Sequence, residues 1–270
     1  MRILAIGDIH GCATALDTLL ATVKPQPADT IVTLGDYVDR RPDSKGVLDR
    51  LISLHETGRL VALRGNHELM ILYAVFSSQN ESSWRIYGGA ETLDSYSDYG
   101  IGQLTDIPAA HWHFIKNICR DYWESDRHFF VHANADPQKP LHQQSEQMLY
   151  WEKFRNPAPH FSGKTMVCGH TSQKSGKPVN LGHAICIDTR IYDNGWLTCL
   201  DVTSSKVWQA NELGQQRTAS IDEFKSPQAP SPQAPSPQAP SPFRVRLQKQ
   251  SPPARAIITS FTGDRQGTGC

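Results

Sequence analysis

Acidic and imidazole side chains follow the first apolar run of the chain, which ends in Gly7-Asp8-Ile9-His10-Gly11. Side chains two positions apart in an extended segment point to the same face, so Asp8 and His10 can address one metal ion. The alternative is a turn in which Asp8 caps a helix over residues 12–23. Taken alone, these residues favour the capping interpretation.

Later apolar runs end in the same kind of residue. The polar side chains that follow them are Asp36, Asp39, Asn66, His67, His132 and His170. Because ligands of α/β proteins gather at the carboxyl ends of strands, we expect these groups to meet on one rim of a sheet. Helix capping needs one Asp or Asn per helix and does not need five such strand ends. The pattern as a whole therefore favours a metal site.

The residue types indicate which metals fit. The candidate ligands are Asp8, His10, Asp36, Asn66, His132 and His170. These oxygen and nitrogen donors, without a thiolate, suit manganese, iron or zinc. Six ligands exceed the need of one tetrahedral ion. A carboxylate such as Asp36 can bridge two divalent ions, which would hold a hydroxide for in-line attack on phosphorus.

Five motifs carry a resemblance to a known family. In this order, "GDIHG", "GDYVDR", "RGNHE", "VHAN" and "CGHT" resemble the phosphoprotein phosphatase family of calcineurin-like metallophosphoesterases, most closely its bacterial and bacteriophage lambda branch. The likeness covers roughly residues 1–211, and five ordered motifs make it specific. It implies a metal-dependent phosphoric monoester hydrolase, most similar to a bacterial enzyme that uses manganese. The implied ligands are Asp8, His10 and Asp36 for metal one, and Asp36, Asn66, His132 and His170 for metal two.

The resemblance also implies roles for residues beside the metals. His67, paired with Asp39, would be the general acid that protonates the leaving alkoxide. Arg40 and Arg64 would grip phosphate oxygens, which suits the forked guanidinium. The phage branch has a further phosphate-binding arginine after a Trp-x-x-x-Arg pattern, and "YWEKFR" offers Arg155 in that register. An exposed helix arginine is the usual alternative for Arg155.

Three features depart from the family pattern or add to it. Arg41 and Arg190 stand where the family usually has glycine. Trp84, with Gly88-Gly89, resembles a family stretch that borders the cleft, although aromatic packing is its default role.

Rival functions make different demands on the motifs. Symmetrical dinucleoside tetraphosphate hydrolases typically lack the second aspartate of "GDYVDR" and read "GNHD", whereas this chain has Asp39 and Glu68. Metallophosphodiesterases usually carry Gly-His-x-His, and Ser172 stands at its last position here. A non-catalytic phosphopeptide-binding protein would lack a ligand, and none is missing. We therefore expect a serine/threonine protein phosphatase, with phosphotyrosine as a further substrate class and phosphorylated proteins or peptides as substrates.

The elements that position these residues alternate between strand and helix. The runs "RILAIGD", "TIVTLGD" and "LVALRGN" are each followed by a predicted helix, over 12–23, 43–57 and 67–78, which indicates a parallel βαβαβ start. Further predicted elements are helices at 108–119 and 143–154, and strands at 129–132, 165–170, 184–188, 196–201 and 206–211. We expect the last three strands to form an antiparallel meander. The predicted fold is an α/β metallophosphoesterase sandwich of mixed β-sheets flanked by helices.

Composition predicts the environment in which the protein works. The 270 residues include 27 basic and 27 acidic side chains, so no strong field favours nucleic acid or membrane. The N-terminus lacks a basic stretch followed by an apolar one, which predicts a cytoplasmic protein. Its 6 cysteines form no Cys-x-x-Cys pair and are expected to be reduced thiols.

The composition changes sharply after residue 225. "SPQAP" repeats across 226–242, and repeated proline favours an extended, polyproline-like chain. We therefore divide the chain into a catalytic domain over 1–225 and a disordered tail over 226–270. The Pro-x-x-P units can contact a proline-reading partner, but a spacer role is favoured.

Overall fold

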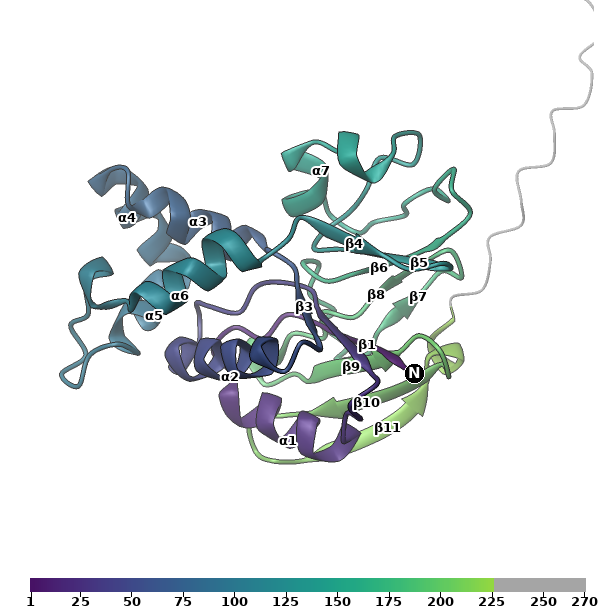
Figure 1. Cartoon of the computed structure of the whole chain (residues 1–270), viewed down its shortest axis with the longest axis horizontal. Coiled ribbons are helices and arrows are strands. Elements are labelled where there is room, and N and C mark those ends of the chain that lie inside the picture. The colour runs from purple at the N-terminus through teal and green to yellow at the C-terminus, as the bar shows by residue number, and fades with distance from the viewer. Residues whose placement is uncertain (226–270) are drawn as a thin grey trace, which may run out of the picture. The chain divides into compact units, whose positions relative to one another are not determined.

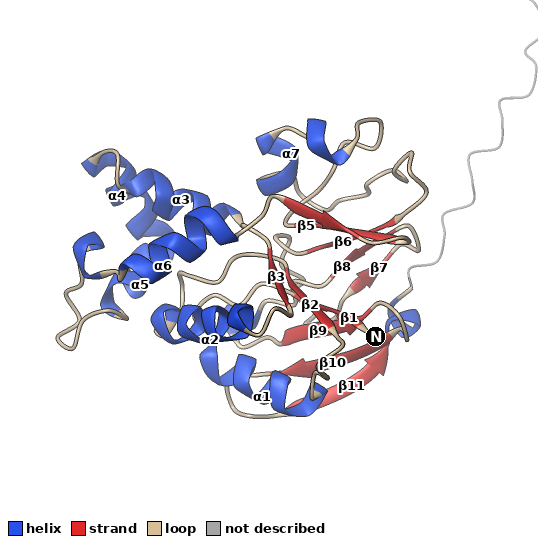
Figure 2. Ribbon diagram, viewed as in Figure 1, coloured by secondary structure: helices blue, strands red, loops and turns tan. Residues whose placement is uncertain are grey.

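Two mixed β-sheets stack face to face in residues 1–225, the part of the chain that the computed structural model describes (Figure 2). The first sheet has the order β11-β10-β9-β1-β2-β3 and the second has the order β4-β5-β6-β8-β7. The strands of the first sheet are β1 (Ile3–Ile6), β2 (Thr30–Thr33), β3 (Leu60–Ala62), β9 (Leu197–Asp201), β10 (Lys206–Ala210) and β11 (Gln216–Ser220). Those of the second are β4 (Tyr122–Glu124), β5 (His128–Val131), β6 (Thr165–Cys168), β7 (Val179–Asn180) and β8 (Ala184–Cys186). The predicted sandwich of mixed sheets is confirmed.

Helices cover the outer faces and extend from one end of the sandwich. The α-helices are α1 (Ala13–Val23), α2 (Ser44–Glu56), α3 (Asn66–Ala74), α4 (Ser78–Trp84), α5 (Ala90–Asp94), α6 (Ala109–His113) and α7 (Glu146–Tyr150). Short π- and 3-10 turns are η1 (Arg85–Gly89), η2 (Leu104–Asp106), η3 (Phe114–Ile118), η4 (Leu141–Gln143), η5 (Ile191–Asp193) and η6 (Ile221–Phe224). Figure 1 shows α1 and α2 beside the first sheet, α3 to α6 grouped at one end, and α7 beside the second sheet.

Strand pairing confirms the start of the fold and corrects its end. β1, β2 and β3 pair in parallel, as the βαβαβ pattern predicts. The meander is formed by β9, β10 and β11, whereas β8 pairs in parallel with β6 in the second sheet. β8 is buried along its whole length, and its apolar residues suit either sheet equally. Its partner is therefore set by the stacking of the sheets and not by its nearness to β9 in sequence.

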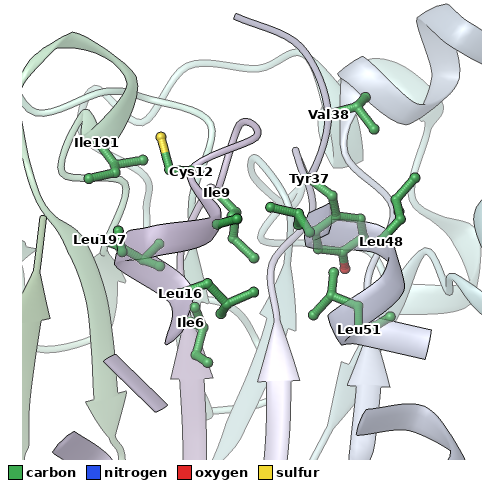
Figure 3. Packing of buried hydrophobic residues seen from close by; sticks show 14 of the residues in the cluster. Ile6, Ile9, Cys12, Leu16, Tyr37, Val38, Leu48, Leu51, Ile191 and Leu197 are labelled. Atoms are coloured by element: carbon green, nitrogen blue, oxygen red, sulfur yellow. The ribbon is translucent and has the colours of Figure 1, made fainter. Parts of the chain in front are cut away.

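Alternating side chains build the core in layers. In β1, Ala5 faces the space between the sheets, whereas Leu4 and Ile6 face the helices. Figure 3 shows Ile6 beside Leu16 of α1, with Leu51 of α2 in the same cluster. Each fully buried Leu or Ile contributes roughly 1.5–3 kcal/mol, so these layers stabilise the sheet ends on which the site depends.

Two predicted helices are shorter than expected. α3 ends at Ala74 and not at 78, because Ser77 caps a new helix by accepting from the Asn80 backbone N–H at 3.1 Å. Within 143–154, only Glu146–Tyr150 is α-helical. The carbonyl of Leu149 accepts from the Ala133 N–H at 2.9 Å, so it bonds to the loop after β5 instead of extending the helix.

Helix length and the state of the cysteines can be read from the described residues. Within residues 1–225, no helix combines the length and apolar character that a bilayer crossing requires. The cysteines of this part, at positions 12, 119, 168, 186 and 199, are unpaired and buried. The predicted tail and its repeats lie outside the described residues.

Candidate metal centre

The loops after five strands bring the six predicted ligands together. Asp8 and His10 follow β1, Asp36 follows β2, Asn66 opens α3 after β3, His132 follows β5, and His170 follows β6. Five of them are at most 6% exposed, and His170 is partly buried. The set draws on both sheets, so their stacking is what closes the cluster.

Asp8 does not cap the first helix. α1 has Cys12 at its N-cap position, with no side-chain capping hydrogen bond. The Asp8 carboxylate instead accepts from the backbone N–H of His170, at 3.0 Å to Oδ2, although the two residues are 162 positions apart. The capping interpretation is therefore wrong, and Asp8 faces the cluster.

The loops of the cluster hold an unusual backbone conformation. Left-handed φ angles occur at His10 (48°), Asp36 (52°), Asp39 (74°), Arg40 (74°) and His170 (59°). Such angles cost L-residues about 1–2 kcal/mol each, and strain of this kind concentrates at functional sites. Gly65 is required for the close approach of two loops, since a Cβ there would lie 2.1 Å from Oδ1 of Asp36.

Three imidazoles are fixed in the orientation that metal ligands need. One ring nitrogen of each donates to a backbone carbonyl: Nδ1 of His10 to Val38 at 2.9 Å, Nδ1 of His132 to Leu34 at 2.8 Å, and Nε2 of His170 to Trp151 at 3.2 Å. The other nitrogen faces the cluster. Burial lowers the pKa of all three rings, that of His170 to about 3, so they are neutral at pH 7 and keep a free lone pair.

The donor atoms form two groups that share Asp36. Ligand atoms of Asp36, His132 and His170 lie within 4.8 Å of one another, and so do those of His10, Asp36 and His67. Oδ1 of Asn66 lies 3.0 Å from Nε2 of His132 and 2.9 Å from Nδ1 of His170, between the two rings. Two groups of oxygen and nitrogen donors joined by one carboxylate fit a pair of divalent ions. The first group contains His67 where the resemblance implies Asp8.

His67 is electrostatically unlike the three candidate ligands. Its Nδ1 donates to Oδ2 of Asp39 at 2.6 Å. Burial lowers the pKa of His67, but the charge of Asp36 and the hydrogen bond to Asp39 outweigh burial and raise it overall. Asp39 is held in turn by Nε1 of Trp84, at 2.9 and 3.0 Å, and by Oγ1 of Thr92 at 2.7 Å. Trp84 thus does more than pack, and sequence reasoning missed Thr92 because no motif contains it.

Arg40 is the predicted phosphate-binding arginine that the structure places at the cluster. Its Nη2 donates to Nε2 of His67 at 3.0 Å. Its guanidinium lies over the ring of Tyr192, 4.1 Å from the ring centre, and the same ring meets His10 edge-on at 5.1 Å. Tyr192, in η5, therefore forms a wall of the site, and no sequence signal marked it.

The other two predicted phosphate-binding arginines, Arg64 and Arg155, make different contacts from those of Arg40. The guanidinium of Arg64 donates to the carbonyls of Lys116 and Cys119, at 3.0 Å each, and pairs with Asp121 at 2.8 Å. These contacts hold the guanidinium in place, and the phosphate-binding role of Arg64 stays a prediction. Arg155 is exposed in a loop after α7, where a helix was predicted, and its assignment stays a prediction.

The backbone conformation differs at the two positions where arginine replaces the glycine that is usual in the family. Arg190 has φ 61°, a conformation that glycine adopts freely, and its Nη2 pairs with Asp193 at 2.7 Å. Arg41 is not among the residues with positive φ, so its backbone makes no such demand.

Glu68 ties two of the site loops together. Its carboxylate accepts from the backbone N–H groups of Gly65, Asp36 and Tyr37, at 2.8 Å each. Burial and the nearby charge of Asp36 raise the pKa of Glu68. Aspartate has one methylene less and would not reach all three donors from the same position.

Curated relatives match only a part of the chain and include two kinds of phosphatase. The chain is 42% identical over 83 residues to the symmetrical bis(5'-nucleosyl)-tetraphosphatase of Acidovorax sp. (strain JS42), covering 30% of this chain and 29% of that protein. It is also 42% identical over 85 residues to serine/threonine-protein phosphatase 1 of Salmonella typhimurium, covering 31% and 37%. The matched stretch thus spans less than two fifths of either relative.

Solved structures with low sequence identity share the fold. A cold-active protein-tyrosine phosphatase of a psychrophilic Shewanella species superposes with a TM-score of 0.57 at 17% identity, covering 80% of each chain. A protein serine/threonine phosphatase from Saccharomyces cerevisiae superposes with a TM-score of 0.52 at 16% identity, covering 85% of this chain and 81% of that one.

A family profile covers most of the chain. The profile described as calcineurin-like phosphoesterase matches residues 1–195, which include all five motifs. The serine/threonine phosphatase relatives agree with the resemblance to phosphoprotein phosphatases. The protein therefore belongs to the calcineurin-like phosphoesterase family.

Proposed function

We propose that the protein is a two-metal phosphomonoesterase that removes phosphate from phosphoserine and phosphothreonine in proteins, with phosphotyrosine as a further substrate class. The observation that carries this proposal is the contrast among the four imidazoles of the site. Burial keeps His10, His132 and His170 neutral, as ligands require, whereas Asp36 and Asp39 favour the protonated form of His67, as a general acid requires.

The donor geometry supports the metal-two set that the resemblance implies and, for metal one, His10 and Asp36. Asp8, His10 and Asp36 would hold metal one, and Asp36, Asn66, His132 and His170 would hold metal two. When bound, two such ions supply a hydroxide nucleophile and stabilise the negative charge of the phosphate. The donor set suits manganese first, with iron or zinc as alternatives.

Arg40 and His67 would act together on the phosphate and the leaving group. In the structure, Nε2 of His67 accepts the hydrogen bond of Arg40, so this nitrogen cannot carry a proton at the same time. Phosphate oxygens would draw the guanidinium away, because a charge-assisted bond to an anion is stronger than one to imidazole. Nε2 can then hold a proton and pass it to the leaving alkoxide, while Nδ1 stays on Asp39.

A small hollow beside the cluster is suited to the part of the substrate beyond the phosphate. It has a volume of about 180 Å³ and is lined by side chains that include Trp84, Trp151, Tyr87 and Met70. Trp84 donates to Asp39, and the Trp151 carbonyl accepts from His170, so two residues that line the hollow also contact residues of the site. Its aromatic and apolar walls fit a side chain that flanks a phosphorylated residue.

Because tetraphosphate hydrolases typically lack both residues, the resemblance makes Asp39 and Glu68 favour a protein substrate over a dinucleotide. Both side chains are fully buried and fully used in the structure, Asp39 on His67 and Glu68 on the loop of Asp36. Symmetrical tetraphosphate hydrolysis remains the second candidate, because a relative with that printed activity is as similar to this chain as the protein phosphatase is.

A substrate panel distinguishes these functions. The full chain, supplied with manganese, would be assayed on phosphoserine, phosphothreonine and phosphotyrosine peptides, diadenosine tetraphosphate and a phosphodiester. An Asp36→Asn protein prepared in the same way controls for contaminating phosphatases. We expect the highest kcat/KM on the first two peptides. Faster hydrolysis of diadenosine tetraphosphate would select the second candidate, and no turnover of any substrate would support a phosphopeptide-binding protein.

The proposed location is the cytoplasm. The five unpaired cysteines of the described residues suit a reducing compartment. A proline-reading partner for the tail stays a prediction from the repeat.

A further inference from the structure

Asp188 is a buried acid that the proposed mechanism does not use. It lies two residues after β8 and is 1% exposed. Its Oδ1 accepts from the backbone N–H of Arg190 at 2.9 Å, which fixes the turn there. Its Oδ2 is one of two buried side-chain polar atoms in residues 1–225 that have no hydrogen-bond partner. An unpaired buried oxygen is unfavourable, and more so when it carries charge.

The residue that carries the unpaired oxygen lies next to the strand end that carries Asp8, a predicted metal-one ligand. Gly7 precedes Asp8, and Ile187 precedes Asp188. A Cβ on Gly7 would lie 2.6 Å from the carbonyl oxygen of Ile187, so the two strand ends are in close contact.

The acid Asp39 is compensated by more hydrogen-bond donors than Asp188 is. Asp39 accepts from His67, Trp84 and Thr92. Burying a carboxylate is unfavourable unless a cation or hydrogen-bond donors balance its charge. Asp188 has the Arg190 N–H on one oxygen only. A divalent cation held by the neighbouring Asp8 would supply the missing compensation.

We propose that Asp188 belongs to the metal-one site as a third carboxylate, beside Asp8 and Asp36, that strengthens the binding of the divalent cation. This inference rests on the proposed two-metal centre and adds a residue to which the family resemblance gives no role. Asp188→Asn keeps an oxygen for the Arg190 N–H and removes the charge, so it separates the metal role from the turn.

The chain offers a closely matched control in Asp201. This residue is also 1% exposed, and its Oδ1 also accepts from the backbone N–H two positions on, that of Thr203, at 2.9 Å. Its Oδ2, however, accepts from Oγ of Ser204 at 2.6 Å. It pairs with Leu4 near the start of β1, away from the strand ends that carry the cluster. Asp201→Asn therefore removes a buried, turn-forming acid without touching the centre.

The test measures metal binding by the full-length chain and does not depend on its substrate. Chelator-stripped wild type, Asp188→Asn and Asp201→Asn would be titrated with manganese by calorimetry, and the rise in Tm on adding manganese would be recorded. We expect Asp188→Asn to weaken one of two sites by roughly 10- to 100-fold and to reduce the rise in Tm. Asp201→Asn should bind manganese like the wild type.

Wild-type affinity at both sites in Asp188→Asn would overturn the proposal. If that variant does not fold, a crystal structure of the wild type with manganese decides instead. Oδ2 of Asp188 must then contact the ion or a water molecule on it, and an Oδ2 without either contact refutes the assignment. A protein that binds manganese in this way but hydrolyses no phosphate ester would contradict the proposed function and leave this inference standing.

Discussion

The two ends of the sandwich handle charge in opposite ways. At the carboxyl ends of the strands, acids and imidazoles are buried together on loops with left-handed backbone, as at Asp36 and His170. At the opposite end, before β1 and β2, Arg2 pairs with Asp29 at 2.6 Å, and the arginine is 27% exposed. One end concentrates charges that need cations or substrate, whereas at the other Arg2 and Asp29 neutralise each other.

This difference indicates which regions of the chain stabilise the fold and which destabilise it. Left-handed residues and the unpaired oxygen of Asp188 are costs that the layered apolar core must offset. These unfavourable conformations persist because the loops that contain them are anchored to strands β1 to β3 and to the second sheet. Changes at the carboxyl end should therefore affect turnover most, and changes at the amino end should affect only stability.

Removal of the metals should have the largest effect. We expect chelation to abolish turnover and manganese to restore it, because oxygen and nitrogen ligands release divalent ions more readily than a thiolate cage does. The check is phosphatase activity before and after stripping, with metal content measured by elemental analysis. Full activity in a sample shown to be free of metal would refute the two-metal centre.

Replacement of the candidate general acid should come next. His67→Asn keeps polarity but removes the proton, so we expect kcat to fall roughly 10²- to 10⁴-fold on substrates with poor alkoxide leaving groups. An activated aryl phosphate should lose less, because its leaving group needs little protonation. Metal content should match the wild type. Equal losses on both substrates, with metals and fold intact, would remove His67 from the mechanism.

His111 provides the matched control for that variant. It is also a buried imidazole bonded to an acid, with Nε2 2.9 Å from Oδ1 of Asp49, and its Nδ1 contacts the Tyr96 hydroxyl at 2.7 Å. It lies in α6, outside the cluster, and its partner Asp49 lies in α2. His111→Asn should lower Tm and leave kcat per folded molecule unchanged. A large loss of kcat there would show that any buried His–Asp pair matters for turnover.

Replacement of Tyr192, which forms a wall of the site, should have a moderate effect on turnover. Tyr192→Ala removes the ring over which Arg40 lies, so we expect KM to rise roughly 3- to 10-fold with a smaller change in kcat. Tyr192→Phe keeps the ring and loses only the contact of the hydroxyl with Oγ of Ser172 at 3.0 Å, so it should stay closer to the wild type. Steady-state kinetics on a phosphopeptide distinguish the two. Equal effects of both variants would assign the role to the hydroxyl.

Removal of the ion pair between Arg2 and Asp29 should have the smallest effect, a loss of stability that depends on pH. The hydrogen bond from Arg2 lowers the pKa of Asp29 from 3.8 to about 2, although burial acts in the opposite direction. Its stabilisation is therefore fully present above pH 3.8 and is lost as the pH falls toward 2. We expect Asp29→Asn to cost about 1–2 kcal/mol at pH 7, with the difference from wild type shrinking below pH 4.

Urea unfolding at pH 7, 4 and 3 measures this difference, and turnover per folded molecule at pH 7 should not change. A stability difference that stays constant over this range would mean that Asp29 acts by packing and not by charge. A loss of turnover at pH 7 would show that the two ends of the sandwich are coupled.

The sequence alone determined much of the candidate centre, because its signals are local. The period of two in β1 sets Leu4 and Ile6 apart from Ala5, and short spacings join Asp8 to His10 and place His67 after Asn66. Neighbouring residues encode strand and turn geometry directly, so the five motifs, the parallel start and the convergence of the ligands could all be predicted.

Only the tertiary structure decided which distant groups meet. It set Asp8 against the backbone of His170, placed Trp84 and Thr92 on Asp39, and occupied the donors of Arg64 with backbone carbonyls. It also moved β8 into the second sheet, which brings Asp188 beside Asp8. Such contacts depend on how two sheets stack and on where long loops return, and no short spacing in a sequence records either.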